Sequence, residues 1–365
     1  MPLPRTAASL HSPQWRKLSN ADQTRKQPAL MDNAVLKRRR TERWLGLILL
    51  ILVALLPLVV TEQYWRGLIV LVLLYAGLSQ GWNVLGGYCG QISLGHALYF
   101  GIGAYTSSIL FTRYGIPPTI GLIPGATLAA AAALLVGWPC FRLSGHYYAI
   151  ATLVFGLIAA LLIQNWEFVN AAMGITIPFR TESWLNLEFR TAVLPFHYAM
   201  LAYAALAWLV AYLVEGSRWG YYWRAVKDDP EAARSLGVRV FPSKMAAAAI
   251  SGAITAIGGS LYAQYIGFID PESTFSLALS VLIALPAVAG GVGTLWGPLL
   301  GAAVLIPVQQ LSIAWFGAAG GGIQLMIYGA LIVILALARP QGLVSLFGIR
   351  SQAGGEVAPN EKVDA

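Results

Sequence analysis

Residues 273–338 read STFSLALSVLIALPAVAGGVGTLWGPLLGAAVLIPVQQLSIAWFGAAGGGIQLMIYGALIVILALA and contain no Asp, Glu, Lys or Arg. A helix that crosses a bilayer needs about 20 mainly apolar residues, so this run of 66 residues is long enough for three crossings. Its apolar residues are continuous rather than alternating, which argues against the strands of a membrane barrel. The stretch therefore predicts an all-α polytopic membrane protein.

The composition of the whole 365-residue chain supports the same fold class. Apolar residues make up 57% and charged residues only 11%, and the mean hydropathy is +0.65. Soluble domains carry about 25% charged residues because their surface faces water. Soluble globular, disordered and fibrous proteins are therefore excluded. With only Cys89 and Cys140 present, so is a disulfide scaffold, and we interpret both cysteines as packing residues.

About ten transmembrane helices follow when the charge-free runs are divided at their Gly and Pro residues. The last three fall within the run quoted above. The third span from the N-terminus is unusually polar, so we expect it to be partly broken. The candidate spans are residues 44–61, 66–86, 91–112, 116–138, 146–165, 194–214, 244–268, 273–290, 296–316 and 322–338.

The basic residues predict an N-in/C-in orientation. With the N-terminus inside, 20 of the 24 Lys and Arg residues lie on the cytoplasmic side, and only Arg66, Arg113, Arg180 and Arg190 lie outside. The net charge of +8 is thereby explained by basic residues that flank spans, so we predict no nucleic-acid partner. The predicted parts are a disordered cytoplasmic tail (1–36), a transmembrane domain (37–347) with a cytoplasmic loop (216–243), and a cytoplasmic C-terminal tail (348–365).

The cytoplasmic loop contains a short helix whose two ends are marked in the sequence. Asp229 is a favourable N-cap, Pro230 suits the first helical position, and Glu231 suits the positive end of the helix dipole. Gly237 stands where a left-handed cap belongs. An ordinary loop helix can have the same caps, so these features alone do not indicate a function.

The residues EAARSLG at 231–237 resemble the first part of the motif of permease subunits of ABC importers. In that family this helix sits in a cleft of the ATPase subunit and passes on its closure. The resemblance implies that the helix and its flanking residues couple the chain to the ATPase. The coupling residues would be Arg224, Asp229, Glu231, Ala232, Ala233 and Gly237. Downstream, VRVFPSK at 238–244 departs from the long form of the motif, which argues against the maltose-type permeases.

Four further blocks resemble branched-chain amino-acid permeases of the LivM type, and together the resemblance covers roughly residues 44–347. They are GWNVLGGYCGQISLGHALYFGIGAY (81–105), RLSGHYYAIATL (142–153), GGVGTLWGPLLGA (290–302) and RPQGL (339–343). One departure concerns the solute, because relatives carry a Gly/Asn-rich outside motif where this chain has NAAMGITIP (170–178).

The resemblance implies an assembly in the bacterial inner membrane. The chain would pair with a second homologous permease, two cytoplasmic ATP-binding subunits and an extracytoplasmic solute-binding protein. ATP would be bound by the partner subunits, with no cofactor and no metal in this chain. The solute would be a branched-chain amino acid or a related amide.

Polar residues inside the membrane predict part of the substrate path. Residues 86–103 combine glycines with polar side chains, and non-helical backbone at membrane depth occurs only inside protein or along a cavity. The candidates are Asn83, Gln91, Ser93 and His96. Close packing is the alternative, since Gly86/Gly90, Gly297/Gly301 and the series Gly252, Ala256 and Ser260 have the spacing of small-residue helix contacts.

The sequence offers no source of energy of its own. We expect the transmembrane route to contain no buried Asp, Glu, Lys or Arg, the residues that a proton- or sodium-coupled carrier usually needs inside its spans. No lysine lies in a Gly-Lys-Ser/Thr phosphate loop, and no catalytic or metal pattern stands out. We therefore expect a non-enzymatic permease subunit driven by a separate ATPase. The alternatives are a stand-alone channel or secondary carrier, and an intramembrane enzyme.

Overall fold

The computed structural model describes residues 42–316, except 144, 181 and 190–192, and also 326, 329–330, 333–334, 337, 339 and 342–347. The predicted tails 1–36 and 348–365 and most of the predicted span 322–338 lie outside the described residues. The chain divides into two units, Met1–Leu56 and Pro57–Ala365. Helix Glu42–Val59 begins in the first unit, and the site lies entirely in the second.

The second unit consists almost wholly of helices. Its elements are α2 (Gln63–Asn83), the π-helix η1 (Val84–Tyr88), α3 (His96–Tyr114), α4 (Pro118–Cys140), α5 (His146–Gln164), the 3₁₀ turns η2 (Glu167–Val169) and η3 (Ala171–Met173), β1 (Ile175–Thr176), α6 (Leu194–Glu215), α7 (Arg218–Asp228), α8 (Pro230–Ser235), α9 (Val240–Ile266), β2 (Phe268–Ile269), α10 (Pro271–Thr274), α11 (Leu277–Gly290), α12 (Gly297–Phe316) and η5 (Leu343–Phe347).

The prediction of an all-α polytopic membrane protein is confirmed. Within the described residues, eight helices are long and apolar enough to cross a membrane. They are Glu42–Val59, Gln63–Tyr88, Pro118–Cys140, His146–Gln164, Leu194–Glu215, Val240–Ile266, Pro271–Gly290 and Gly297–Trp315. The predicted span 91–112 appears as α3, which begins only at His96 because Cys89–Gly95 is not helical. Its glycines and polar residues keep α3 from being counted among these eight helices.

Small residues let the central helix α9 approach α3 and α4 closely, as their spacing predicts. Gly252 lies against Ala129 and Ala133 of α4, and Ser260 donates a 2.8 Å hydrogen bond to the carbonyl of Gly103 in α3. A Cβ atom at Gly103 would collide with the backbone of Ala256. These contacts bring the helix backbones close together, the packing that small residues permit between membrane helices.

A second close contact joins α11 and α12. A Cβ atom at Gly301 would overlap the carbonyl oxygen of Pro286, and one at Gly290 would overlap that of Gly297. Gly297 and Gly301 therefore make the small-residue contact that their spacing predicts. Gly86 and Gly90 do not, because Gly86 packs beneath Trp82 of its own helix and Gly90 faces Lys227 of α7.

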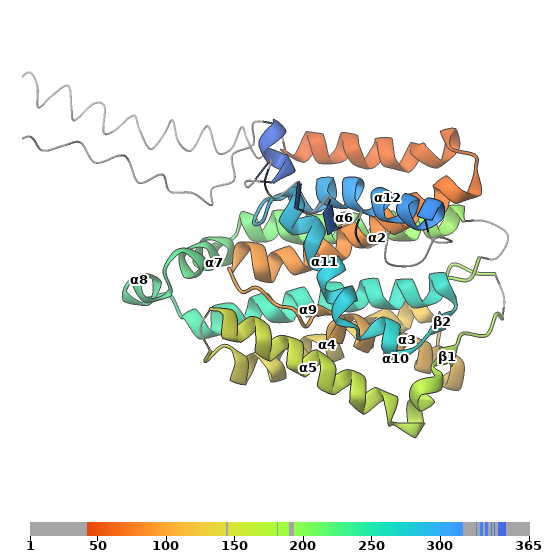
Figure 1. Ribbon diagram of the computed structural model, residues 1–365, viewed down its shortest axis with the longest axis horizontal. Coiled ribbons are helices and arrows are strands. Elements are labelled where there is room, and N and C mark those ends of the chain that lie inside the picture. The colour runs from red at the N-terminus through yellow and green to blue at the C-terminus, as the bar shows by residue number, and fades with distance from the viewer. Residues whose placement is uncertain are drawn as a thin grey trace, which may run out of the picture. The chain divides into compact units, whose positions relative to one another are not determined.

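The two ends of the helical bundle carry different structures. Helices α7 and α8 lie at one end, and β1, β2 and α10 lie at the other (Figure 1). Strand β1 pairs with β2 in antiparallel register, with Ile175 opposite Ile269. The predicted cytoplasmic loop and the predicted outside loop are thus at opposite ends, as a membrane crossing requires.

The predicted cytoplasmic loop 216–243 is more regular than its sequence indicates. One short helix is predicted there, but an 11-residue helix, α7, precedes it, and α9 begins at Val240 rather than at 244. Gly220, Trp223 and Val226 recur at three-residue intervals and form the buried side of α7. Pro242 does not interrupt α9 because it lies in the first turn, where no helical N–H is needed.

Candidate functional site

Helix α8 has both of the caps that its sequence predicts. The Asp229 carboxylate accepts hydrogen bonds from the backbone N–H groups of Glu231 (2.8 Å) and Ala232 (3.1 Å). At the other end Gly237 has a φ of +86° and donates to the Arg234 carbonyl, while Val238 donates to that of Ala233. This pair of bonds is a Schellman motif, which requires a left-handed residue at the position of Gly237.

The surface of α8 is exposed except for Ala233, whose side chain is buried. Glu231 and Arg234 form a salt bridge of 2.9 Å on the exposed side. Leu236, directly after the helix, is 83% exposed, and no motif in the sequence marks it. Single exposed leucines are common, so the interest of Leu236 lies in its place directly after the exposed, capped helix α8.

Helix α7 fixes α8 to the membrane helices. The Trp223 indole is fully buried and donates a 2.9 Å hydrogen bond to the carbonyl of Ser243 in the first turn of α9. Arg224 donates to the carbonyl of Glu215 at the end of α6, at 2.9 Å. Arg224 therefore ties α7 to α6 from within the loop.

The second part of the site is the break between α2 and α3. Helix α2 continues into a π-helical turn, η1, a feature that often marks functional sites, and then leaves the helical path at Cys89. Side chains from other helices satisfy the backbone here. Thr152 of α5 accepts from the N–H of Leu94 at 3.1 Å, and Ser280 of α11 accepts from that of Ala97 at 2.9 Å.

Asn83 joins this break to the turn between α11 and α12. Its amide nitrogen donates to the carbonyl of Thr294 (2.9 Å), and its amide oxygen accepts from the N–H of Gly293 (2.8 Å). The side chain is completely buried. These contacts assign Asn83 a structural part in holding two glycine-rich segments together.

The other three predicted path residues differ in how many of their polar side-chain atoms form hydrogen bonds. Ser93 is buried and accepts from the N–H of Gly95 at 3.3 Å. His96 is buried, and its Nε2 lies 2.8 Å from the hydroxyl of Ser251 near the middle of α9, whereas its Nδ1 has no partner among the described residues. Gln91 is half-buried, with one long bond of 3.4 Å to the carbonyl of Cys89.

The remaining hydrogen-bonding capacity therefore lies with Gln91 and His96. The structure brings Asn83, Ser93 and His96 to the same broken segment, since Trp82 beside Asn83 donates from its indole nitrogen to the carbonyl of Ser93 at 2.9 Å. The six predicted coupling residues lie on α7, α8 and the caps of α8. The roles of both sets in transport stay predictions.

The predicted outer loop, residues 166–193, is tied to the end of α9. Asn170 and Ala171 have positive φ values of 62° and 49°, and the Asn170 amide donates to the carbonyl of Gly174 at 3.3 Å. A Cβ atom at Gly174 would collide with the carbonyl of Ile269, so β1 lies directly on β2. The loop is thus a defined structure on the surface opposite α8.

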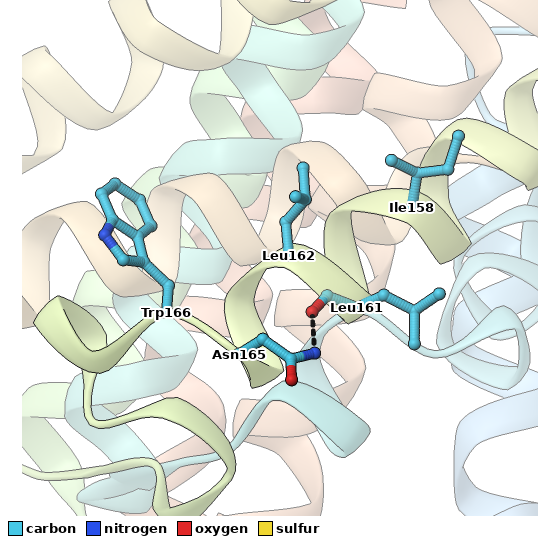
Figure 2. A pocket seen from close by; sticks show the side chains of 5 residues that line it. All are labelled: Ile158, Leu161, Leu162, Asn165 and Trp166. Atoms are coloured by element: carbon cyan, nitrogen blue, oxygen red, sulfur yellow. Dashed lines mark hydrogen bonds between the residues drawn. The ribbon is translucent and has the colours of Figure 1, made fainter.

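A shallow apolar groove of about 500 Å³ runs along the last turns of α5 and is lined by Ile158, Leu161, Leu162, Asn165 and Trp166. Ile158, Leu162 and Trp166 project from the same side of the chain (Figure 2). Asn165 donates to the carbonyl of Leu161 at 2.8 Å, so its amide turns back onto the helix. An apolar groove of this kind suits lipid or an apolar partner better than a polar solute.

A family model described as "Branched-chain amino acid transport system / permease component" matches residues 65–336. The chain is 32% identical over 326 residues to the high-affinity branched-chain amino acid transport system permease protein LivM of Escherichia coli K12. That match covers 81% of this chain and 75% of LivM.

More distant relatives have two kinds of name. The high-affinity branched-chain amino acid transport system permease protein LivH of Salmonella typhimurium is 24% identical over 74% of this chain and 91% of its own length. The fructose import permease protein FrcC of Rhizobium meliloti is 28% identical over 63% of this chain and 64% of its own length. No solved structure matches the chain.

Proposed function

We propose that this chain forms part of the translocation path of an ATP-driven importer. The proposal starts from its family, because the chain belongs to the permease components of branched-chain amino acid ABC transport systems. The proposed solute is small and amino-acid-like, a branched-chain amino acid or a related amide. In this proposal the chain catalyses no reaction and lies in the bacterial inner membrane with α7 and α8 in the cytoplasm. A second permease, two ATP-binding subunits and an extracytoplasmic solute-binding protein complete the assembly.

The observation that carries the proposal is the geometry of α8. It is capped at both ends without help from other elements, it is exposed, and α7 and the start of α9 connect it to two membrane helices. A force on α8 would therefore reach the bundle. Ala232 and Ala233 allow a partner to approach closely, the charges of Glu231 and Arg234 offer pairing, and Leu236 offers an apolar anchor.

Gln91 and His96 are the proposed polar contacts of the solute. Each keeps hydrogen-bonding capacity at the broken segment, which supports a path for a polar molecule. The relative named as a fructose import permease indicates that this architecture serves more than one solute class. The choice between solutes is therefore assigned to the binding protein, which delivers its ligand at the end that carries β1 and β2.

Cross-linking from α8 tests the proposed docking. Ala232→Cys places an exposed thiol on α8, and Met173→Cys places one on η3 at the opposite end, where the side chain is 85% exposed. In the co-expressed assembly, a short reagent that couples to the thiol at one end and is photoreactive at the other should link the first variant to an ATP-binding subunit and leave the second unlinked. Cys89 and Cys140 are buried and give no background.

The pair of variants makes the outcome unambiguous. A link from residue 173 to the ATP-binding subunit would place the partner at the wrong end. Absence of any link from residue 232, in an assembly that still transports, would show that α8 is not the docking element.

A further inference from the structure

Lys227 occupies a slot between three segments of the chain, and neither the sequence motif nor the family resemblance assigns it a role. It is the next-to-last residue of α7, two positions before the cap of α8. Its ammonium group donates a 2.9 Å hydrogen bond to the carbonyl of Gly87 in η1. Gly87 is 140 positions away in the chain, so only the fold brings the two together.

The slot is formed by glycines. A Cβ atom at Gly90 would lie 2.8 Å from Cγ and 3.1 Å from Cβ of Lys227. A Cβ atom at Gly293 would lie 3.1 Å from the ammonium nitrogen. Gly90 and Gly293 have φ values of +72° and +75°, a conformation in which other residues are strained. The aliphatic part of the Lys227 side chain thus packs on Gly90, and its ammonium group lies between Gly87 and Gly293.

The helix formed by α2 and η1 ends without a cation of its own. Neither element has a basic residue in its last turn, and the chain after Tyr88 is not helical, so terminal carbonyls such as that of Gly87 lack helical donors. A cation at this end is favourable because the helix dipole concentrates negative charge there. Lys227 supplies this cation from α7. Burial lowers the pKa of Lys227 and neighbouring Asp228 opposes that shift.

The same place is also connected to α11 and α12. Asn83 holds Gly293 and Thr294, and Gly293 lies beside the Lys227 ammonium group. A displacement of the end of α7 would therefore act at once on the π-helical turn, on the non-helical segment 89–95 and on the turn after α11.

We propose that Lys227 is the positioning residue that transmits movement of α8 to the broken membrane helix. When the ATP-binding subunits close on α8, the end of α7 moves with it, because a single residue, Asp229, separates the two helices and bonds to both. The Lys227–Gly87 hydrogen bond then pulls η1 and the segment that leads to Gln91 and His96. This inference rests on the proposed function and identifies the Lys227–Gly87 hydrogen bond as the contact through which the movement passes.

Lys227→Met tests the inference, since methionine keeps the length of the side chain but removes its charge and its donors. In the complete assembly in proteoliposomes, the amount of solute moved per ATP hydrolysed should fall by about tenfold, as loss of a hydrogen bond to a charged group implies. The amount of ATP-binding subunit that co-purifies should not change. Arg218→Met removes an exposed cation from the same helix and should leave the ratio as it was.

A conformational measurement distinguishes two roles of Lys227: passing movement of α8 to the broken segment, or only stabilising the fold. Ile92 lies in the non-helical segment and is 58% exposed, so a thiol in Ile92→Cys reports on that segment. Its rate of alkylation should change on addition of ATP and vanadate in the parent assembly and should stay constant when Lys227→Met is also present. An unaltered response in the double variant, with unaltered coupling, would overturn the inference.

Lys227→Arg keeps the test decisive if the Met variant assembles poorly. Arginine retains the charge and a donor, and its ratio of solute to ATP should stay within about threefold of that of the parent. A fall as deep as that in the Met variant would contradict the inference. If the parent assembly itself shows no ATP-driven uptake, the proposed function fails instead, so the two failures are distinguishable.

Discussion

Asn83 shows how one buried amide can join parts of the chain that are far apart in sequence. Its two hydrogen bonds reach Gly293 and Thr294, 210 and 211 positions away. Removing the side chain leaves a buried N–H and a buried carbonyl without partners. A cavity between η1 and the turn after α11 would form as well.

We expect Asn83→Ala to destabilise the protein by about 2 kcal/mol, because buried groups without hydrogen bonds are costly. The measurement is the Tm of the detergent-solubilised protein. Asn165→Ala is the matched control, since the Asn165 amide is exposed and bonds only within its own helix. Equal Tm values for the two variants would show that the Asn83 bonds add nothing.

Gln91 is the predicted path residue that is best placed to contact a passing solute. It is half-buried and makes a single long bond, so Gln91→Leu removes little structure. We expect lower uptake in the reconstituted assembly, with ATP hydrolysis and assembly retained. Unchanged uptake for every solute tried would assign Gln91 to packing.

At this scale the sequence predicts local contacts and misses distant ones. Asp229 and Gly237 were recognised because a cap involves residues that lie within a few positions of one another. The partners of Asn83, Lys227 and His96 depend on how whole helices pack, and no spacing in the sequence indicates them. Leu236 was missed because exposure, rather than residue type, makes it notable.

Helix α8 is the element on which the proposed coupling depends. Proline cannot adopt the φ of +86° at Gly237 and lacks the N–H that bonds to Arg234, so Gly237→Pro should unravel the end of the helix. Glu231→Lys reverses the charge at the dipole-favoured end. Both variants should insert into the membrane and assemble but hydrolyse ATP without matching uptake.

Gly267→Pro is a control for strain alone. Gly267 ends α9 with a φ of +77° at the opposite end of the bundle, so its replacement should lower stability without uncoupling hydrolysis from uptake. If Gly237→Pro and Glu231→Lys both retain normal solute-stimulated hydrolysis and uptake, α8 has no coupling role.

Elements with a strong local pattern were predicted, and elements made by tertiary contacts were not. The small-residue series on α9 and the glycines of α12 pack as their spacing predicts. Helix α7 was missed because its buried side is short and is surrounded by polar and aromatic residues. The break after η1 was expected from its glycines and polar residues, whereas the side-chain acceptors from α5 and α11 that stabilise it could not be predicted from spacing.

The whole molecule has two chemically distinct ends and an interior with few charges. Arg113 lies over the ring of Phe168 and Arg180 over that of Phe111. Two of the three described arginines that the charge bias predicts outside therefore lie with the predicted outer loop. Lys227 and Arg224 lie at the other end. Composition alone was enough to predict this class of protein, because a charge-poor helical chain has no other stable environment.

We predict that the chain moves solute only when a separate ATPase acts on it. The most direct measurement is uptake of labelled branched-chain amino acid into proteoliposomes that contain this chain alone or the complete assembly with its binding protein. We predict no uptake above empty liposomes for the chain alone, and uptake in the complete assembly only when ATP is supplied. Sustained flux through the chain alone would contradict the account.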